Sequence, residues 1–496
     1  MTAPDEAYDV VVAGGGGAGL AAAIEAAAAG ARVVVLEKAG ELRGSTGRSV
    51  GSIAASRTPD QHRLGIDDSA DRHLADYRKL SGALADIEDP ELARVLTDNA
   101  TATTAWLRSL GVEFYGPVGE PPHTAPRLHN VLPGSRAYIH HLHKRARRLG
   151  VTIRLNTEAR RLLTERGRVT GVEAGTADGR GQTYAARCGV VLATGDFSAS
   201  ADMKRTWIDD TVASFVPVNP YATGDAQRMA MDLGAQMLNA EVFDVPSMRL
   251  APPPSDGLFG LLQRLPPSRA LTLPIRWGLR HLPGWLVRSL MMGFVTTYLS
   301  PREALFEHGA ILVDAAGALR SGADENINLT VARLGVDGGY IIGDRALYER
   351  FSRDPHYVAT APGVAHAYLP DFRRARKDVY AEAPTLDGLA RRIGVPADAL
   401  TAAVRKAGSC AAGRELDQPP YFALGPVRAY LIQTNGGLRI SERMEVLSAS
   451  GDPIPGLYAA GNAGQGGLAL YGHGHHLGWA FTSGRIAGRQ AAPPPR

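Results

Sequence analysis

The chain has 496 residues, of which 45% are hydrophobic and 21% are charged, so it can bury a sizeable core and is not disordered over most of its length. Its net charge of +4 is small for this length and gives no indication of nucleic-acid binding. The two cysteines, Cys188 and Cys410, lie in no cysteine or histidine cluster. We therefore expect neither a metal site nor a disulfide scaffold, although a single disulfide stays open.

A βαβ unit opens the chain. The mostly apolar run at residues 9–13 predicts a buried parallel strand, and the alanine-rich segment 20–29 predicts a helix. A second buried strand is predicted at residues 31–36, and Glu37 follows it. This order of strand, glycine turn, helix, strand and acid spans about 30 residues, the length of a dinucleotide-binding unit.

Further elements follow in chain order. Helices are predicted at residues 92–110, 137–149, 386–393, 398–406 and 479–489, and strands at residues 151–155, 168–174, 189–195 and 452–462. The pattern changes after about residue 240, with prolines at 252–254 and no acid between Asp256 and Glu303. We therefore predict an α/β protein whose Rossmann-like domain comprises residues 1–239 and 433–496, with an α+β cap domain, residues 240–432, inserted between them.

Gly14, Gly16 and Gly19 fit the pattern G-x-G-x-x-G between the first strand and the first helix. Glycines allow a tight turn and a close approach to a pyrophosphate, which then lies at the positive N-terminus of the helix. Glu37, which closes the second strand, is placed to accept a ribose hydroxyl group. A glycine turn without a ligand and a solvated acid are the simpler alternatives, and the strand–turn–helix context favours a nucleotide site.

Six motifs in the expected order resemble one family, the FAD-dependent fumarate reductase and 3-ketosteroid dehydrogenase superfamily. The resemblance covers residues 1–235 and 430–496, is closer to the ketosteroid dehydrogenases, and is poor in the middle, where that family selects its substrate. The motifs are GGGGAGLAAA (14–23), VVVLEK (33–38), GSTGRSVG (44–51), VVLATGDFS (190–198), TGDAQRMA (223–230), and GLYAAGN (456–462) with SGRIAGR (483–489).

The resemblance implies that FAD is the cofactor. Ser45, Thr46 and Gly51 would lie along the isoalloxazine ring, with Asn462 near the ribityl chain. Relatives with covalently held flavin have a histidine where this chain has Ser45, so we expect non-covalent FAD. The implied FAD-binding residues are Gly14, Gly16, Gly17, Ala18, Gly19, Glu37, Lys38, Ser45, Thr46, Gly51, Ala193, Thr194, Gly195, Asp225, Gly461, Asn462, His476 and Leu477.

The resemblance also implies a reaction. Members pass a hydride between the flavin and a carbon near an activating carbonyl, and a proton moves at the neighbouring carbon. Fumarate reductases clamp a dicarboxylate with an arginine and a histidine, and the matching positions here hold His476 and Gln433; the acidic and arginine segment expected from Leu319 is also missing. We therefore expect a lipophilic, steroid- or terpenoid-like ketone as substrate, with an electron donor or acceptor that the motifs do not identify.

Two other functions stay open, namely reduction of a small unsaturated acid and redox sensing by bound flavin without turnover.

Tyr471 occupies the place of the ketosteroid dehydrogenase tyrosine, so its phenol would polarise a carbonyl or take a proton. His473 would support it, and Tyr115 is a weaker candidate for lining the pocket. The alternatives are a packed aromatic residue for Tyr471 and an ordinary polar residue for His473.

The segment at residues 258–299 combines large apolar side chains with arginines and contains no acid. This composition predicts contact with an anionic membrane surface or a cover over an apolar pocket, and a buried helical pair with outward-reaching arginines is the alternative. No stretch reaches the roughly 18 apolar residues of a spanning helix, and the N-terminus lacks the apolar segment of a signal peptide. We expect a cytoplasmic protein, with peripheral membrane contact as a hypothesis.

Overall fold

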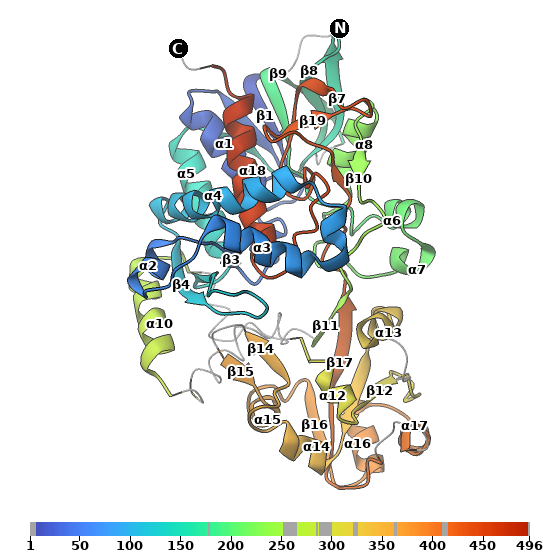
Figure 1. The fold of residues 1–496 in the computed structure, drawn as a ribbon. Helices are drawn as coiled ribbons and strands as arrows, with labels where there is room; N and C mark the ends of the chain where they lie inside the picture. The colour runs from blue at the N-terminus through green and yellow to red at the C-terminus, as the bar shows by residue number, and fades with distance from the viewer. Residues whose placement is uncertain are drawn as a thin grey trace.

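The computed structural model of the protein describes residues 6–176, 179–250, 265–283, 286, 300–320, 326–361, 365–408 and 415–494. Figure 1 shows two bodies. The main body contains both ends of the described chain and the largest sheet. The cap body, coloured yellow to orange, is built around a second sheet from the middle of the chain. The predicted α/β fold, a Rossmann-like domain with an inserted α+β domain, is therefore confirmed.

Strand β1 (Glu6–Ala13) lies at the centre of the main sheet, between the parallel strands β2 (Val33–Leu36) and β9 (Gly181–Leu192). Val10, Val11 and Val12 have no exposed surface, as expected for the central strand of a parallel sheet that is covered on both faces. Six of its eight strands have the order β19-β20-β9-β1-β2-β6. The outer strands are β6 (Thr152–Arg154), β19 (Glu445–Leu447) and β20 (Pro453–Ala459).

The two ends of the sequence meet in a helix pair. Helix α1 (Gly17–Ala28) follows the glycine turn, and α18 (His475–Ala491) packs beside it, as the blue and red ribbons of Figure 1 show. A β-carbon added at Gly484 would lie 2.4 Å from the Ala18 carbonyl oxygen, and one at Gly488 would lie 2.1 Å from that of Ala22. The glycines thus let the two backbones come into contact, which places the C-terminal segment against the first βαβ unit.

Smaller layers complete the main body. An antiparallel ladder, β7 (Thr157–Glu165) and β8 (Arg168–Thr176), extends from β9, and a three-stranded sheet has the order β3-β5-β4. The remaining elements of this body are β3 (Ser52–Ala54), α2 (Pro59–Arg63), α3 (Ala70–Ser81), α4 (Pro90–Ser109), β4 (Glu113–Val118), β5 (Leu128–Leu132), α5 (Arg136–Arg148), α6 (Ala201–Trp207), α7 (Asp210–Ala213), α8 (Asp225–Met231), β10 (Met237–Leu238) and β18 (Gly437–Leu438).

The cap body is an α+β unit. Its sheet has the order β11-β17-β13-β12, with β16 also paired to β17, and all of these pairs are antiparallel. The strands are β11 (Ser247–Leu250), β12 (Ile311–Asp314), β13 (Gly339–Gly343), β16 (Tyr380–Ala383) and β17 (Tyr421–Tyr430), and a separate hairpin is formed by β14 (Ala359–Ala361) and β15 (Ala365–Ala367). The helices are α12 (Ala304–Glu307), α13 (Ile327–Arg333), α14 (Arg345–Arg350), α15 (Leu369–Ala375), α16 (Leu386–Ile393) and α17 (Ala397–Gly408).

Most predicted elements occur within a few residues of their expected bounds. The first helix begins at Gly17, three residues before the predicted start, because the last glycines of the turn already adopt helical geometry. The strand predicted at residues 189–195 ends at Leu192, which leaves Thr194 and Gly195 in a loop at the edge of the sheet. The domain limits at 239/240 and 432/433 stay predictions, and β11 and β17 lie within them.

The segment predicted to contact membranes is only partly described. Within it, α10 (Arg269–His281) lies beside the main body near α2 and β4 (Figure 1), whereas residues 258–264, 284–285 and 287–299 lie outside the described residues, as does Cys410. In the part of the chain that the structure describes, none of the helices has the length and apolar character needed to cross a membrane.

Candidate functional site

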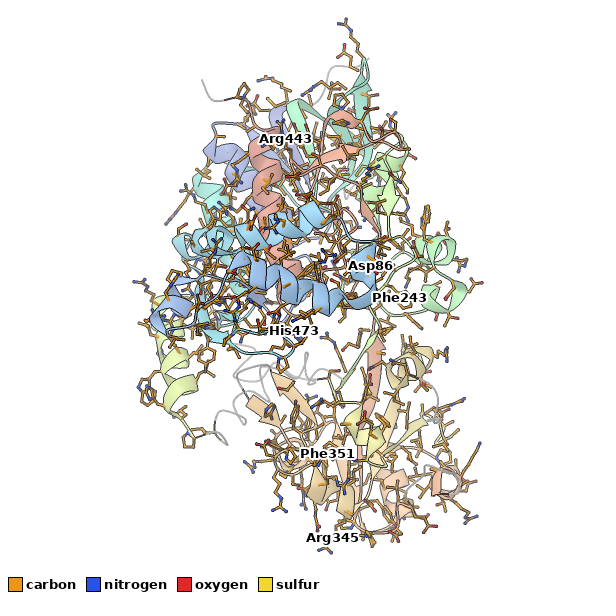
Figure 2. The ribbon with its side chains drawn as sticks, in the orientation of Figure 1. Asp86, Phe243, Arg345, Phe351, Arg443 and His473 are labelled. Carbon is orange, nitrogen blue, oxygen red and sulfur yellow. The ribbon has the colours of Figure 1, made fainter. Side chains whose placement is uncertain are left out.

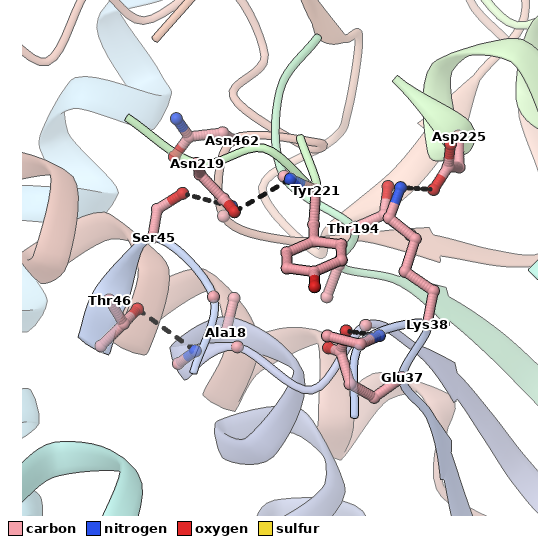
Figure 3. Close-up of a pocket in the computed structure, with 18 of the residues that line it drawn as sticks. Ala18, Glu37, Lys38, Ser45, Thr46, Thr194, Asn219, Tyr221, Asp225 and Asn462 are labelled. Carbon is pink, nitrogen blue, oxygen red and sulfur yellow. Dashed lines mark hydrogen bonds and ion pairs between the residues drawn. The ribbon is translucent and has the colours of Figure 1, made fainter. Parts of the chain in front are cut away.

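A pocket opens at the carboxyl ends of the parallel strands, the usual ligand position in open α/β sheets. It holds about 800 Å³ of space, open solvent at its mouth included, and Figure 3 shows the residues around it. Most of the predicted FAD-binding residues line it. They are Gly14, Gly16, Gly17, Ala18, Glu37, Lys38, Ser45, Thr46, Ala193, Thr194, Gly195, Asp225, Gly461 and Asn462.

The glycine turn forms one wall of the pocket. Gly14 has φ +105°, and a β-carbon there would lie 2.3 Å from the Ala193 carbonyl oxygen. One at Gly19 would lie 1.9 Å from the Gly14 carbonyl oxygen, so Gly19 supports the turn from behind and does not line the pocket. The first turn of α1 contains no acid, and the Gly17 N–H donates to the Thr46 hydroxyl at 3.2 Å, so the positive end of the helix faces the pocket with no carboxylate from its own first turn. This geometry fits a pyrophosphate group.

Glu37 forms the adjoining wall. Its two carboxylate oxygens accept hydrogen bonds from the backbone N–H groups of Gly15 and Ala39, each at 2.8 Å. The side chain is buried and yet lines the pocket. Because each carboxylate oxygen has a second lone pair, Glu37 can still accept hydrogen bonds from the hydroxyl groups of a ribose. The turn and Glu37 together fit the adenosine diphosphate half of FAD.

A polar link closes the pocket on its far side. Lys38 Nζ lies 2.8 Å from a carboxylate oxygen of Asp225, and the Thr223 hydroxyl donates to the other oxygen at 2.6 Å. Helix α8 is tied to the sheet edge by the Ala226 N–H, which donates to the Thr194 hydroxyl at 3.0 Å. The close-up in Figure 3 shows Lys38 reaching across to Asp225. Asp225 therefore has a cation partner and adds no unpaired negative charge to a site expected to hold phosphates.

Three side chains at the pocket mouth were not predicted. Asn219 donates to the Ser45 hydroxyl at 3.0 Å, and the Tyr221 ring lies across the opening in Figure 3. The Arg48 guanidinium lies 5.7 Å from the centroid of that ring and donates to the Gly44 carbonyl at 3.0 Å. Burial lowers the pKa of Arg48, and no carboxylate within the described ranges forms an ion pair with it. A phosphate of the cofactor could be the anionic partner of Arg48. The sequence alone does not indicate this role, because a single arginine in a polar loop is common.

Asn462 connects the pocket to a second polar group of residues. Its amide donates to the Gln433 side-chain oxygen at 2.8 Å, and the Gln433 amide donates to a ring nitrogen of His476 at 3.0 Å. Burial lowers the pKa of His476 to about 4, so the ring is neutral at pH 7. His476 is thus separated from the pocket wall by Gln433, and Leu477 and Gly51 also do not line the pocket.

Of the predicted catalytic residues, His473 lies on the cap-facing side of the main body, where Figure 2 labels it. The His473 ring contacts the Glu120 carboxylate, and this hydrogen bond raises the pKa of His473. Burial, and then the charge of Asp244, raise the pKa of Tyr471, so its phenol is protonated at pH 7. Tyr115 lies on β4 opposite Asn130, and among the described residues it makes no hydrogen bond to Tyr471 or His473.

Asp244 was not predicted either. It belongs to a short segment that pairs with residues 433–435: its N–H donates to the Gln433 carbonyl at 3.3 Å, and the Asn435 N–H donates to the Val242 carbonyl at 2.9 Å. Burial raises the pKa of Asp244 to about 7, and one of its carboxylate oxygens has no hydrogen-bond partner among the described residues. An acid inside the apolar stretch 242–246 is the only sequence feature that distinguishes it.

Comparison with known proteins agrees with this pocket. The sequence model of the FAD binding domain family matches residues 9–474. A vinyl phenol reductase of Lactiplantibacillus plantarum is 28% identical, over 99% of this chain and 97% of that protein. The open conformation of a flavocytochrome c3 fumarate reductase has a TM-score of 0.73 at 23% identity, over 98% of this chain and 78% of the other. The 3-ketosteroid-Δ4-(5α)-dehydrogenase of Rhodococcus jostii RHA1 has a TM-score of 0.61 at 26% identity, over 99% and 98%.

Proposed function

The chain belongs to the FAD binding domain family and is an FAD-dependent oxidoreductase, and from this premise we propose that it adds or removes hydrogen across a carbon–carbon bond beside the ketone of a lipophilic, steroid- or terpenoid-like substrate. When bound, FAD supplies the redox chemistry by exchanging a hydride with a substrate carbon. The chain's own residues would bind and orient both molecules and move the proton. We also propose that the FAD is held non-covalently, because Ser45 stands where relatives with covalently held flavin have a histidine.

The observation that carries this proposal is the neutral character of the polar groups beyond Asn462. His476 is uncharged at pH 7 because burial lowers its pKa to about 4, and it hydrogen-bonds to the uncharged Gln433 amide. His473 already has the Glu120 carboxylate as its partner. A dicarboxylate would need unpaired cations at these positions, because two buried carboxylates are costly without them. A ketone needs only hydrogen-bond donors.

Tyr471 is the donor that we assign to the ketone. Because burial and Asp244 raise its pKa, the phenol keeps its proton at pH 7 and can donate to a carbonyl oxygen. Such a hydrogen bond polarises the carbonyl and activates the neighbouring C–H or C=C bond. His473 borders the same side of the main body, with half of its side chain exposed, and would contact the substrate or a bound water.

The test is an anaerobic screen. The FAD-loaded protein is photoreduced, and 4-androstene-3,17-dione, 4-vinylphenol or fumarate is added while the flavin absorbance near 450 nm, about where oxidised flavin absorbs, is followed. We expect the steroid enone to reoxidise the flavin. Reoxidation by 4-vinylphenol alone would move the substrate to conjugated phenols and overturn the ketone assignment. Failure of all three probes would favour a flavin sensor without turnover.

Reduction of a small unsaturated acid is the second candidate function. It is favoured by Arg249 on β11, whose charge reaches His473 and opposes the rise in the pKa of that ring. One arginine at the cap side could bind one carboxylate, and the relative of known structure with the higher TM-score is a fumarate reductase. Rapid reoxidation by fumarate and none by the enone would establish this function.

We also propose that α10 touches an anionic membrane surface and so brings the lipophilic substrate to the cap. Leu273 and Trp277, one helical turn apart, are 55% and 60% exposed, and on the same helix Arg269 is largely exposed although it lies 3.5 Å from Glu113. Arg276 forms an ion pair with Glu113 on β4, which fixes α10 to the main body. An exposed apolar pair with neighbouring cations is typical of helices that lie on lipid surfaces.

Vesicle co-sedimentation tests this contact. We expect the protein to bind phosphatidylserine vesicles at low salt, to be released by added salt, and to lose binding when Leu273 and Trp277 are both changed to Ser. The matched control is Val336→Ser, which removes another exposed apolar side chain, 65% exposed, from the cap body. Equal binding by both variants, or none by the wild type, would remove the membrane from the functional account.

A further inference from the structure

The backbone just before Tyr471 is held in an unusual conformation. Leu470 has φ +56°, in the left-handed region that non-glycine residues rarely adopt, and Gly472 and Gly474 also have positive φ. Such a conformation is unfavourable for a non-glycine residue and persists only where the surroundings impose it. Buried side chains from α3 and the segment after it supply that constraint.

Tyr77 and Glu88 hold the two residues before Tyr471. The Ala469 N–H donates to Glu88 Oε1 at 2.6 Å, and the Leu470 N–H donates to the Tyr77 hydroxyl at 3.2 Å. The Tyr77 hydroxyl in turn donates to the same Glu88 oxygen. Tyr77 is fully buried and Glu88 is 9% exposed, so water does not compete for these bonds. Two consecutive backbone N–H groups are therefore fixed by one phenol–carboxylate pair.

His73 and His475 hold Tyr471 itself. His475 Nδ1 lies 2.6 Å from the Tyr471 carbonyl oxygen, and since a carbonyl only accepts, Nδ1 carries the proton. Burial lowers the pKa of His475 to about 3, so the ring is neutral and its Nε2 is an acceptor. His73 Nε2, 3.1 Å away, must then be the donor. His73 on α3 therefore donates to His475, and His475 donates to the carbonyl oxygen of Tyr471.

The α3 end of this chain of contacts is itself fixed. Arg127 has no exposed surface and forms ion pairs with Asp68 at 2.6 Å and with Asp76, on α3, at 2.5 Å. The His123 ring lies 5.5 Å from that of His475, between Arg127 and the histidine pair. A buried ion pair that keeps its partners costs a great deal to disrupt. Helix α3 is thus a rigid support from which the Tyr471 loop is held.

We infer that Tyr77, Glu88, His73 and His475 are positioning residues that set the place of the Tyr471 hydroxyl relative to substrate. The inference rests on the proposed role of Tyr471. None of the four lines the FAD pocket, and their hydrogen bonds end on the backbone of residues 469–471. Their loss should therefore reduce turnover and leave FAD binding unchanged. A misplacement of about 1 Å can cost about 100-fold in rate.

The experiment compares matched variants of Glu88 in the FAD-loaded protein. Glu88→Gln keeps an oxygen that accepts from both Ala469 and Tyr77, whereas Glu88→Ala keeps none. We expect kcat to stay within about twofold for the first and to fall about 10-fold or more for the second, at equal FAD content. Turnover is measured with the probe from the screen above that reoxidises wild-type flavin. Tyr77→Phe, which removes the acceptor of Leu470, is expected to behave like Glu88→Ala.

A double-variant cycle shows whether the effect passes through Tyr471. If it does, Glu88→Ala lowers kcat in the wild type but causes little further loss in a Tyr471→Phe background, because residues that act as one unit are not additive. Additive losses in the cycle, or full activity of Glu88→Ala, would overturn the inference. Full activity of Tyr471→Phe alone would instead overturn the proposed role of Tyr471.

Hydrogen exchange gives a readout without substrate. The Leu470 N–H should exchange faster in Tyr77→Phe than in the wild type, while exchange in α1 beside the FAD pocket stays unchanged. Unchanged exchange at Leu470 would also overturn the inference, because it would mean that the Tyr77 hydroxyl does not hold this segment.

Discussion

The Tyr471 hydroxyl is the single group on which the proposed chemistry depends most. Tyr471→Phe removes one oxygen and leaves the backbone bond from His475 in place, so folding and FAD content should be unaffected. We expect turnover to fall by about 10²–10⁴, the usual effect of losing a positioned acid or base. Steady-state kinetics with flavin absorbance as the occupancy control checks this. Turnover close to that of the wild type would move the role to Tyr115 or His473.

Arg48 permits a second test at the scale of one residue. Its guanidinium lines the pocket without a carboxylate partner among the described residues, and it hydrogen-bonds to Gly44 beside the start of α1. Arg48→Gln should raise the Kd for FAD about 10- to 100-fold, which corresponds to losing a charge-assisted hydrogen bond. Arg43→Gln is the control, because Arg43 belongs to the same loop but pairs with Glu41 and does not line the pocket. Fluorescence titration of the apoprotein with FAD would show equal Kd values if Arg48 does not contact the cofactor.

At the scale of elements, the contact between α1 and α18 joins the two ends of the chain. A methyl group at Gly488 would lie 2.1 Å from a backbone oxygen of α1, which cannot move aside as a side chain can. Gly488→Ala should therefore lower the free energy of unfolding by about 1–3 kcal/mol through overpacking. Gly478→Ala, in the same helix, would meet only the flexible Leu96 side chain at 3.3 Å and should be close to neutral. Urea denaturation compares them, and equal stability of the two variants would contradict the close contact.

How far the sequence predicts this structure also depends on the element. The βαβ unit was predictable because the run 9–13, the glycine turn and Glu37 follow one another within about 30 residues, so their pattern can be recognised in one short stretch of sequence. Tyr471 was identified by a motif, but its support from α3 was not, because His73 and His475 are 402 positions apart and ordinary as single residues. Asp244 was missed for the same reason, since its neighbours come from residues 433–435.

For the whole molecule, the two chain segments that connect the main body to the cap body lie close to Tyr471, because the charge of Asp244 in one of them raises the pKa of Tyr471. Residues 242–244 leave the main body and residues 433–435 return to it, and these two segments pair with each other. Figure 2 labels Phe243 in the first of these segments, above the cap sheet. Asp244 and Gln433 therefore belong to the segments that would move if the cap body shifted relative to the main body. A substrate held between the bodies would contact the part of the chain that connects them.

The buried histidines predict how the stability of the whole molecule depends on pH. Burial lowers the pKa of His475 to about 3 and of His129, His141 and His476 to about 4, whereas the unfolded value is 6.5. The unfolded state therefore takes up these protons first, and stability falls as pH drops below 6.5. Asp244 opposes this trend, because its folded pKa of about 7 lies above the unfolded value of 3.8 and the folded state binds that proton first. Between pH 7 and 5.5 the four histidines outweigh Asp244, because four groups lose stability in this range and one gains it, so the net stability falls. Urea unfolding of the FAD-loaded protein, followed by circular dichroism at pH 7.0, 6.0 and 5.5, measures this loss, and constant or rising stability over that range would mean that the rings are not held neutral in the folded state.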